Sequence, residues 1–364
     1  MKISDITHYL ESIAPLAYQE SYDNCGLIVG NKDSNVSKVL ISLDCTERVV
    51  EEAIERGCEL IVAHHPIVFS GLKKFNGSNY VERTIINAIK NDIAIYAIHT
   101  NLDNVANGVN AMIAEKIGLQ HISILQPKHN LLSKLVTFIP AEHFEKVADA
   151  VFAAGGGNIG NYAEAGFSQS GTGTFKGNEH SNPFIGKQGA RERVNEIRFE
   201  TIFPSFLASK IISALVKSHP YEEVAYDIIL LSNASQTIGS GAVGTLSEEL
   251  DSLEFLQNLK ETMNTDCIRY TPIHKGRFQK IAVCGGSGRF LLPDAIAAGA
   301  DLFITSDFKY HDFFDAESKI TIADIGHYES EQFTKDLLKR VLLEKFSTFA
   351  VLISQTNTNP VNYL

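Results

Sequence analysis

The sequence lacks the features that mark several large classes of protein. It has no tryptophan and five cysteines in 364 residues, and the cysteines form no C-x-x-C pair. Scattered thiols argue against a thiolate zinc site and favour a reducing, cytoplasmic compartment. No apolar run approaches the length of a membrane span. The first fifteen residues include Asp5 and Glu11, so we expect an amphipathic helix there and no signal peptide.

Positive charge is also scarce. The chain has 32 lysines and arginines against 43 aspartates and glutamates, which gives a net charge of -11. An acidic chain lacks the broad basic surface on which nucleic acid binds, so we expect no nucleic-acid partner. The rest of the composition, 44% hydrophobic and 21% charged, is that of a globular protein with an ample core. Its length suggests two domains or one large one.

The most informative residues are His64 and His65, which follow the apolar run Leu60–Ala63. Four apolar residues indicate a buried parallel strand, so the two imidazoles come at its end. An isolated pair of this kind is more often one structural and one exposed histidine. Neutral imidazole is nevertheless the commonest protein ligand for metals. The pair therefore has to be interpreted together with the rest of the chain.

Two further apolar runs end in polar clusters. One leads into His99 and Asp103, and the other leads into His327 and Glu331. His327 and Glu331 are four residues apart at the start of a predicted helix, so their side chains face the same way. In open α/β sheets, ligands bind at the carboxyl ends of the strands, where all three clusters are expected. The pattern therefore predicts one shared site.

Together the clusters supply three imidazoles and two carboxylates as candidate metal ligands: His64, His65, Asp103, His327 and Glu331. Four ligands close a tetrahedral zinc site, whereas five, with carboxylates able to bridge, fit two metal ions that share a water or hydroxide. The mixed nitrogen and oxygen set suits zinc, iron, manganese or nickel. We expect two divalent ions per chain, with zinc as the first choice.

Other polar residues near these clusters are candidates for supporting roles. Glu329 and Asp307 are candidate catalytic residues that would move protons, and His99, Lys309 and His311 are candidates for orienting the ligands. Each could equally be a surface or core polar residue.

Two motifs have competing interpretations. Gly285-Gly286-Ser287-Gly288 could hold an anion with backbone N–H groups, but it lacks the G-x-G-x-x-G spacing and a Walker lysine, which favours a tight turn. The run from His219 to Glu223 has the residue types of a site, although it more simply turns the chain into a strand.

The first and last parts of the chain alternate strand and helix, which predicts parallel strands. The middle has the order β-α-β-β-α-β, the signature of a ferredoxin-like domain. We therefore expect an α/β protein with one discontinuous domain and one insert. The domain, with a mainly parallel sheet, covers residues 1–129 and 236–364, and the ferredoxin-like α+β insert covers 130–235.

The sequence resembles the Nif-three-like family, whose members are often labelled homologues of GTP cyclohydrolase I, type 2. The motifs that carry the resemblance are Tyr22–Gly30, Ala63–Pro66, His99–Asp103, Thr305–His311 and Gly326–Glu331. The resemblance implies a dinuclear metal site on the same five residues that the spacing suggests. It also implies a toroidal homohexamer whose sites face an internal cavity, and a middle domain similar to PII/CutA-type proteins.

Two classes of function stay open. The first is a metal-dependent hydrolase, in which a metal-bound hydroxide attacks a small phosphorylated or nucleotide-like substrate. The family label suggests GTP, although nothing in the sequence selects a purine. The second is a non-enzymatic role in metal handling or as a regulatory hexameric scaffold, which the expected insert supports by fold analogy. Nucleic-acid binding by a ring is a third class, and the acidic charge disfavours it.

Overall fold

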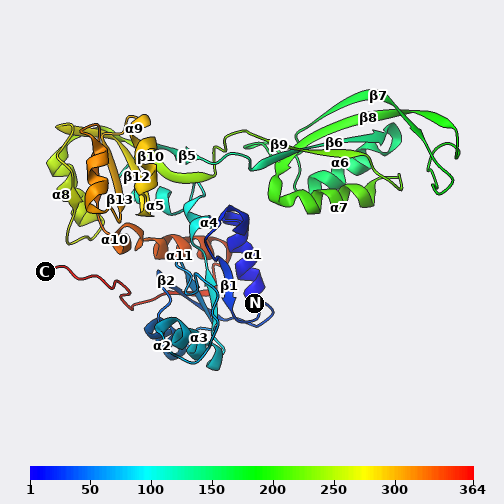
Figure 1. Ribbon diagram of the computed structural model, residues 1–364. Coiled ribbons are helices and arrows are strands. Elements are labelled where there is room, and N and C mark those ends of the chain that lie inside the picture. The colour runs from blue at the N-terminus through cyan, green and yellow to red at the C-terminus, as the bar shows by residue number, and fades with distance from the viewer. The chain divides into compact units, whose positions relative to one another are not determined.

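The computed structural model describes all 364 residues, which form two compact units. Unit 1 joins Met1–Pro127 to Gln236–Leu364, and unit 2 is the continuous segment Lys128–Ser235. Figure 1 follows the chain through both units by colour. No helix in either unit combines the length and the apolar composition that crossing a bilayer requires.

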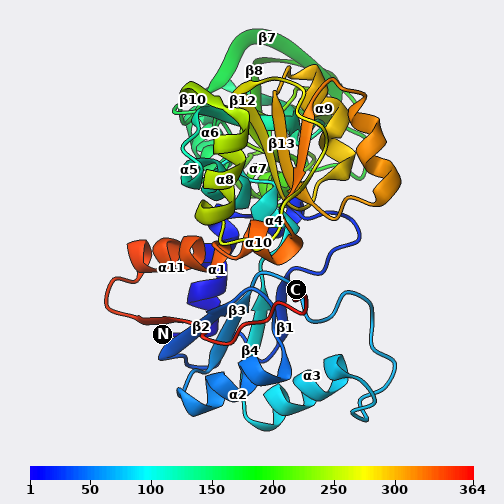
Figure 2. The same cartoon turned by 90° about the vertical axis from the view of Figure 1, so that its left-hand side faces the viewer.

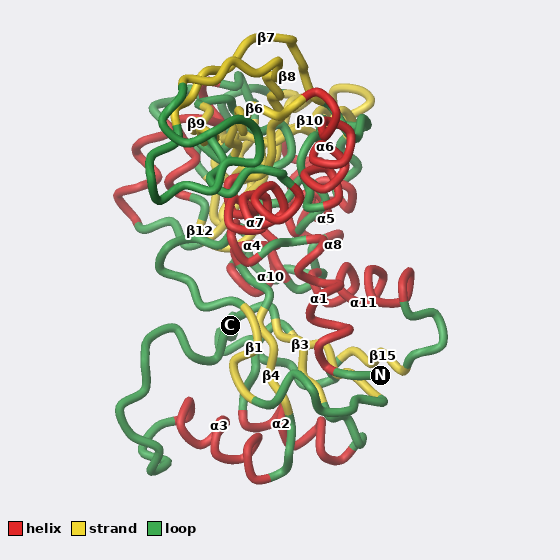
Figure 3. The backbone as a smooth tube through the Cα atoms, turned by 90° about the vertical axis from the view of Figure 1, so that its right-hand side faces the viewer, coloured by secondary structure: helices red, strands yellow, loops and turns green.

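The first sheet of unit 1 has five strands and helices on both faces. Its order is β1 (Gly26–Val29), β4 (Ala94–Ala97), β3 (Leu60–Ala63), β2 (Lys38–Ser42) and β15 (Ala350–Ile353). All neighbours are parallel except β1 and β4. Helices α2 (Glu47–Glu55) and α3 (Tyr80–Lys90) cover one face, and α1 (Ile3–Ile13) and α11 (Thr334–Lys345) cover the other (Figures 2 and 3). Because helices bury both faces of the sheet, its central strands are almost wholly apolar.

The second sheet of unit 1 has six strands and is mixed. Its order is β11 (Arg269–Tyr270), β14 (Thr321–Asp324), β13 (Leu302–Ser306), β12 (Arg277–Ser287), β10 (Gly239–Asp251) and β5 (Gln120–Pro127). Only β12, β13 and β14 are mutually parallel, since β5, β10 and β11 run antiparallel to their neighbours. Helices α5 (Val109–Lys116), α8 (Ser252–Thr262) and α9 (Leu292–Ala297) pack on it.

The expectation of a mainly parallel sheet is therefore right for the first sheet and wrong for the second. Strand β10 begins Gly-Ser-Gly-Ala, which has none of the β-branched or aromatic residues by which a strand is recognised in a sequence. Its pairing with β12 and β5 supplies the stability that its own residues lack.

Unit 2 is a four-stranded antiparallel sheet with two helices. Along the chain the elements are β6 (Leu132–Pro140), α6 (Phe144–Ala153), β7 (Gly166–Lys176), β8 (Arg191–Pro204), α7 (Ala208–Ser218) and β9 (Tyr226–Leu231). The strand order across the sheet is β7-β8-β6-β9. Both helices lie on one face of the sheet (Figure 1), where Phe199 and Phe203 are buried among residues of α6 and α7. The opposite face carries no helix.

Glu52 on α2 fixes the segment that follows β15. Its carboxylate accepts hydrogen bonds from the Ser354 hydroxyl (2.5 Å), the backbone N–H of Gln355 (2.9 Å) and the Thr356 hydroxyl (2.8 Å). The backbone N–H of Thr356 donates a fourth at 3.2 Å, and Arg56 donates a fifth at 2.6 Å. One carboxylate therefore joins the helix to the chain beyond the last strand.

We expect Glu52→Gln to destabilise unit 1 by about 2 kcal/mol at pH 7, because the hydrogen bonds to a charged acceptor are weakened. Burial raises the pKa of Glu52, but the hydrogen bonds outweigh burial and lower the pKa to about 2. The stabilisation is therefore fully present above the ordinary pKa near 4.5 and is lost as the pH falls through about 2. Urea unfolding at pH 7 and pH 3 tests this, with Glu51→Gln as the exposed control. A difference from wild type that does not shrink at pH 3 would contradict it.

Candidate metal centre

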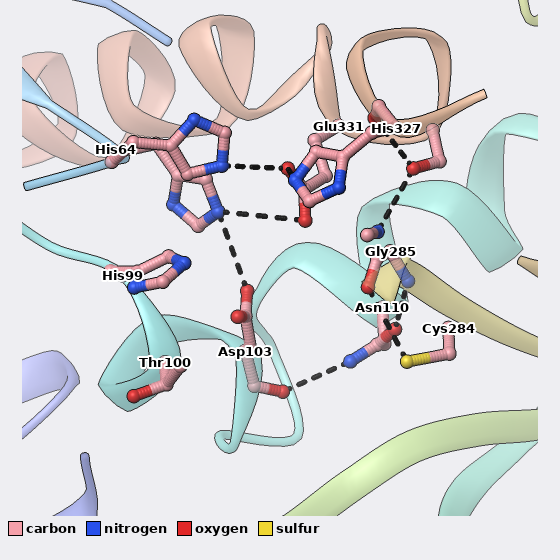
Figure 4. A network of polar contacts seen from close by, with 12 residues as sticks. His64, His99, Thr100, Asp103, Asn110, Cys284, Gly285, His327 and Glu331 are labelled. Atoms are coloured by element: carbon pink, nitrogen blue, oxygen red, sulfur yellow. Dashed lines mark hydrogen bonds and ion pairs between the residues drawn. The ribbon is translucent and has the colours of Figure 1, made fainter. Parts of the chain in front are cut away.

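Side chains at the carboxyl ends of parallel strands from both sheets of unit 1 converge on one point (Figure 4). His64 and His65 follow β3 directly. Asp103 ends the short helix α4 (Thr100–Asp103) that comes after β4. His327 and Glu331 are the first and last residues of α10 (His327–Glu331), which comes after β14. Parallel strands thus bring residues more than 250 positions apart to one site.

Glu331 lies at the centre of this group, and its side chain is 3% exposed. Its Oε2 is 2.9 Å from His65 Nε2 and 3.2 Å from His327 Nε2. Its Oε1 is 3.9 Å from His64 Nε2, which in turn is 3.6 Å from Asp103 Oδ1. Separations of this size are those of ligands that share a cation about 2.1 Å away from each.

Each imidazole of the cluster is oriented by an acceptor at Nδ1, so that Nε2 faces the centre. The acceptors are the Ile98 carbonyl for His64 (2.8 Å), Asp44 for His65 (2.8 Å), Asp307 for His327 (2.7 Å) and Asp23 for His99 (2.9 Å). Histidines that ligate metals nearly always donate the other ring N–H in this way, which fixes the tautomer.

Two atoms in the centre have no partner within the chain. His64 Nε2 and Asp103 Oδ1 are buried and make no hydrogen bond, although they face one another. His64 Nδ1 donates to the Ile98 carbonyl, so Nε2 of the neutral ring is an acceptor, as is the carboxylate oxygen. Two buried acceptors aimed at the same space are costly unless something positive lies between them. A metal cation meets that requirement.

The charges of the cluster are strongly perturbed. Burial lowers the pKa of His65 and His327, but hydrogen bonds to carboxylates outweigh it and raise the pKa to about 9 and about 11 respectively. Burial raises the pKa of Asp103 to about 7. Burial also acts to raise the pKa of Glu331, but the imidazoles around it hold that pKa well below its usual value. A bound cation would replace the imidazolium protons as the partner of Glu331.

Two groups of three residues have ligand atoms within 4.8 Å of one another. One is His64, His65 and His99, and the other is His65, His327 and Glu331. Both contain His65, and each has the number of protein ligands found at an open metal site. The residues present therefore fit a metal centre.

Gly286 provides the space that Glu331 occupies. A Cβ placed on Gly286 would lie 2.4 Å from Glu331 Oε1, and the backbone of Gly286 has a φ of +62°. Its N–H donates to the Ser330 hydroxyl at 2.9 Å. Gly285 to Ser287 end strand β12, where the register with β13 shifts, so the run is an irregular strand end and not the tight turn that the sequence favours. Gly286 makes room there for the Glu331 carboxylate.

Comparison with known proteins identifies the family of the chain. The Duf34/NIF3 family model, described as NGG1p interacting factor 3, matches residues 1–360. The chain belongs to the NIF3 family. It is 39% identical to a protein of Halalkalibacterium halodurans named GTP cyclohydrolase 1 type 2 homolog, with both chains covered in full. It is 37% identical to the protein of the same name from Bacillus subtilis, with 99% of this chain and 98% of the relative covered.

A solved structure described as a Bacillus cereus protein related to NIF3 has the same fold. The TM-score is 0.84 at 38% identity, and the match covers 100% of this chain and 99% of the other. The mixed α/β fold with several sheets is therefore that of a NIF3 protein.

The remaining residues singled out in the sequence of this NIF3 chain divide into two groups. His99, Asp307 and Glu329 line the same cavity as the centre, whereas Lys309 and His311 do not. Asp307 has a φ of +62°, a strained conformation for an aspartate that positions its carboxylate on His327. Glu329 is 6% exposed and accepts a hydrogen bond from Asn359 at 2.9 Å. His311 instead stacks on Phe314 at the surface.

Sequence reasoning missed four residues that support the centre of this NIF3 protein. Asp44 and Asp23 hold His65 and His99, and Asp44 could have been found because it follows the strand next to the one that carries His65. Thr358 donates to Asp44 at 2.5 Å, and Asn359 donates to Glu329. Nothing in the local sequence around Thr358 and Asn359 indicates a site.

Proposed function

We propose that this protein holds two divalent metal ions through His64, His65, Asp103, His327 and Glu331, with zinc as the first choice, and that it hydrolyses a small phosphorylated or nucleotide-like substrate. The observation that carries the proposal is the pair of buried, unpartnered acceptors, His64 Nε2 and Asp103 Oδ1. A set of five ligands that includes two carboxylates able to bridge supports two ions rather than one.

Metal ions at such a site lower the pKa of bound water and polarise the bond to be broken. The chain's own residues supply position. Asp44, Asp307 and the Ile98 carbonyl fix the orientation of the imidazoles. The ligand side chains therefore lose little conformational entropy when they bind a metal ion. Asp307 is already used in orienting His327, which leaves Glu329 as the carboxylate that we propose to carry protons to and from the substrate.

The lining of the cavity around the centre suits a substrate with a flat ring. It has a volume of about 1010 Å³ and contains Arg269, which pairs with Asp324. Tyr22, Phe69 and Phe290 line it and are more than half exposed. Exposed aromatic faces next to a metal centre suit a base or similar ring. The relatives' name, GTP cyclohydrolase 1 type 2 homolog, makes GTP the first nucleotide to test.

We further propose that unit 2 is a ferredoxin-like domain of the PII/CutA type and that the protein assembles as a toroidal homohexamer. The chain order β6-α6-β7-β8-α7-β9 and the strand order β7-β8-β6-β9 support the first part. The second part follows from family resemblance. Sedimentation velocity of the intact protein tests it, with a species of six chains expected and a monomer as the contradicting result.

The hydrolase proposal is tested with wild type and His64→Ala on a panel that contains GTP, other nucleoside triphosphates and phosphate esters. We expect wild type to release product from at least one compound after loading with zinc or manganese. We also expect His64→Ala to lose that turnover, since His64 supplies a ligand with no other hydrogen-bonding role at Nε2. Activity that survives intact in His64→Ala, or no turnover over the whole panel, would contradict the proposal and favour the metal-handling or scaffold role.

We expect Asp44→Asn to weaken metal binding by roughly 10- to 100-fold. Asp44 accepts from His65 Nδ1 at 2.8 Å, so the amide can present its nitrogen instead and favour the wrong tautomer. Competition with a coloured chelator measures the change. Asp33→Asn is the control, because that side chain is 61% exposed and far along the chain from the ligands. Equal affinities for Asp44→Asn and wild type would contradict an orienting role of Asp44 on His65.

A further inference from the structure

Unit 2 contains a second cavity that the metal centre does not explain. Its volume is about 670 Å³, and every residue that lines it belongs to unit 2. It lies against strands β7 and β8 and the loop that joins them. Its lining residues Arg198 and Glu196 pair with Gln169 and Gly171 across these two strands. Phe199 and Phe203, whose positions on β8 alternate with those of Glu196 and Arg198, belong to the core on the helix side instead.

Glycine creates this cavity. Strand β7 has Gly171 and Gly173 where side chains would otherwise project on this face of the sheet. A Cβ on Gly171 would meet no atom within 4 Å, so the glycine borders open space. A Cβ on Gly173 would lie 1.9 Å from Glu196 Oε2. Gly173 therefore leaves room for the carboxylate to lie flat on the strand.

The Glu196 carboxylate forms the polar floor of the cavity. The residue is 9% exposed, and Oε1 accepts a hydrogen bond from the Tyr221 hydroxyl at 2.8 Å. Oε2 has no hydrogen-bond partner in the chain. The nearby guanidinium of Arg198 is directed to Glu200 instead, at 2.8 Å. A carboxylate has about four acceptor positions, so Oε2 is free to accept hydrogen bonds from a donor in the cavity.

Aromatic rings form the walls. Tyr221 is 6.1 Å from Phe175 and 6.4 Å from Phe184, measured between ring centroids. Phe138 also lines the cavity. His219 fixes the turn that carries Tyr221, because its Nε2 bonds the Phe138 carbonyl and its Nδ1 accepts the backbone N–H of Tyr221. The His219–Glu223 run therefore does more than turn the chain, since it delivers an aromatic wall.

The balance of charge at the cavity favours a cation. Glu196, Glu222 and Glu223 line it, against Lys176 and Arg198, and Arg198 is paired with Glu200. The π faces of aromatic rings attract cations as well. A quaternary ammonium would have no N–H for Glu196, whereas a primary ammonium or a guanidinium has several.

We propose that this cavity binds a small organic cation with N–H donors, a primary ammonium or guanidinium on an apolar or aromatic body. Its donors reach Glu196 Oε2, and its body packs on Phe175 and Tyr221. The proposal does not depend on the metal centre or on hydrolysis. It makes unit 2 a ligand-binding unit in its own right.

Calorimetric titration of the intact protein with phenethylamine and with agmatine tests the proposal. We expect at least one of them to bind with a dissociation constant below roughly 1 mM. Glu196→Gln, which keeps the shape and a partner for Tyr221, should weaken binding about tenfold or more. Gly171→Val should abolish binding by filling the cavity, and valine suits a strand. Tetramethylammonium should bind much more weakly than either amine.

Matched controls separate this site from general effects. Glu145→Gln removes an exposed charge from the same unit, and Gly276→Val adds a side chain at a glycine with open space in unit 1. Both should bind the amines as wild type does, and so should His64→Ala. The proposal is overturned if neither amine binds at roughly 10 mM. It is equally overturned if Glu196→Gln binds the amines as tightly as wild type, or if His64→Ala abolishes amine binding. A third contradicting result is that GMP, tested as an anionic nucleotide, occupies the cavity in preference to the amines.

Discussion

Glu331→Gln is expected to reduce metal affinity by about 100-fold or more, because Glu331 is the carboxylate that three imidazoles share. Its Oε2 contacts His65 Nε2 at 2.9 Å and His327 Nε2 at 3.2 Å, and its Oε1 lies 3.9 Å from His64 Nε2. Glutamine keeps the shape but replaces one oxygen by a donor and removes the charge. Glu331→Gln would then offer one ligand oxygen fewer to a metal ion.

Competition of zinc between the protein and a chelator of known affinity measures this loss. Glu344→Gln, an exposed glutamate on α11, is the matched control and should bind metal as wild type does. Thermal unfolding of both variants without metal checks that the fold is intact. If Glu331→Gln folds and still binds zinc within a few-fold of wild type, Glu331 is not a metal ligand.

Gly286→Ala is expected to have the second largest effect, although it changes no candidate ligand. The new Cβ would lie 2.4 Å from Glu331 Oε1, and the φ of +62° is strained for alanine. We expect a loss of stability of about 2 kcal/mol from the strained backbone. Metal binding should also fall by at least tenfold, because Glu331 can no longer occupy its position.

Gly299→Ala separates the two causes. Gly299 has a φ of +70° but no atom within 4 Å of an added Cβ, so its alanine variant carries the backbone strain without the collision. Gly299→Ala should lower the unfolding midpoint while keeping full metal affinity. The interpretation fails if the two variants lose metal affinity equally, or if neither loses any.

Much of the site was predictable because strand ends follow a simple rule. Apolar runs that end in His64 and His65, or that lead to His327, identify the carboxyl edge of parallel strands without any tertiary information. The four-residue spacing of His327 and Glu331 likewise gave their common direction, since α10 keeps both on one face. That these side chains bind metal stays a prediction.

The features that the sequence did not predict depend on contacts between residues far apart in the chain, which local sequence patterns do not indicate. Asp23 reaches His99 across 76 residues, and Thr358 reaches Asp44 across 314. Strand β10 is stabilised by its neighbours rather than by its own glycine-rich residues. The cavity in unit 2 arises from the absence of side chains at Gly171 and Gly173, and periodicity cannot distinguish such an absence from a weak strand. Each is a product of tertiary packing.

The metal content of the protein as purified tests the proposed dinuclear centre most directly. Elemental mass spectrometry on wild type, prepared without added metal, should give about two divalent ions per chain, since five ligands with two carboxylates able to bridge suit a pair of ions. His64→Ala and Glu331→Ala, prepared in the same way, should each fall well below that value. One ion or none in wild type, or unchanged content in both variants, would contradict a dinuclear centre at these residues.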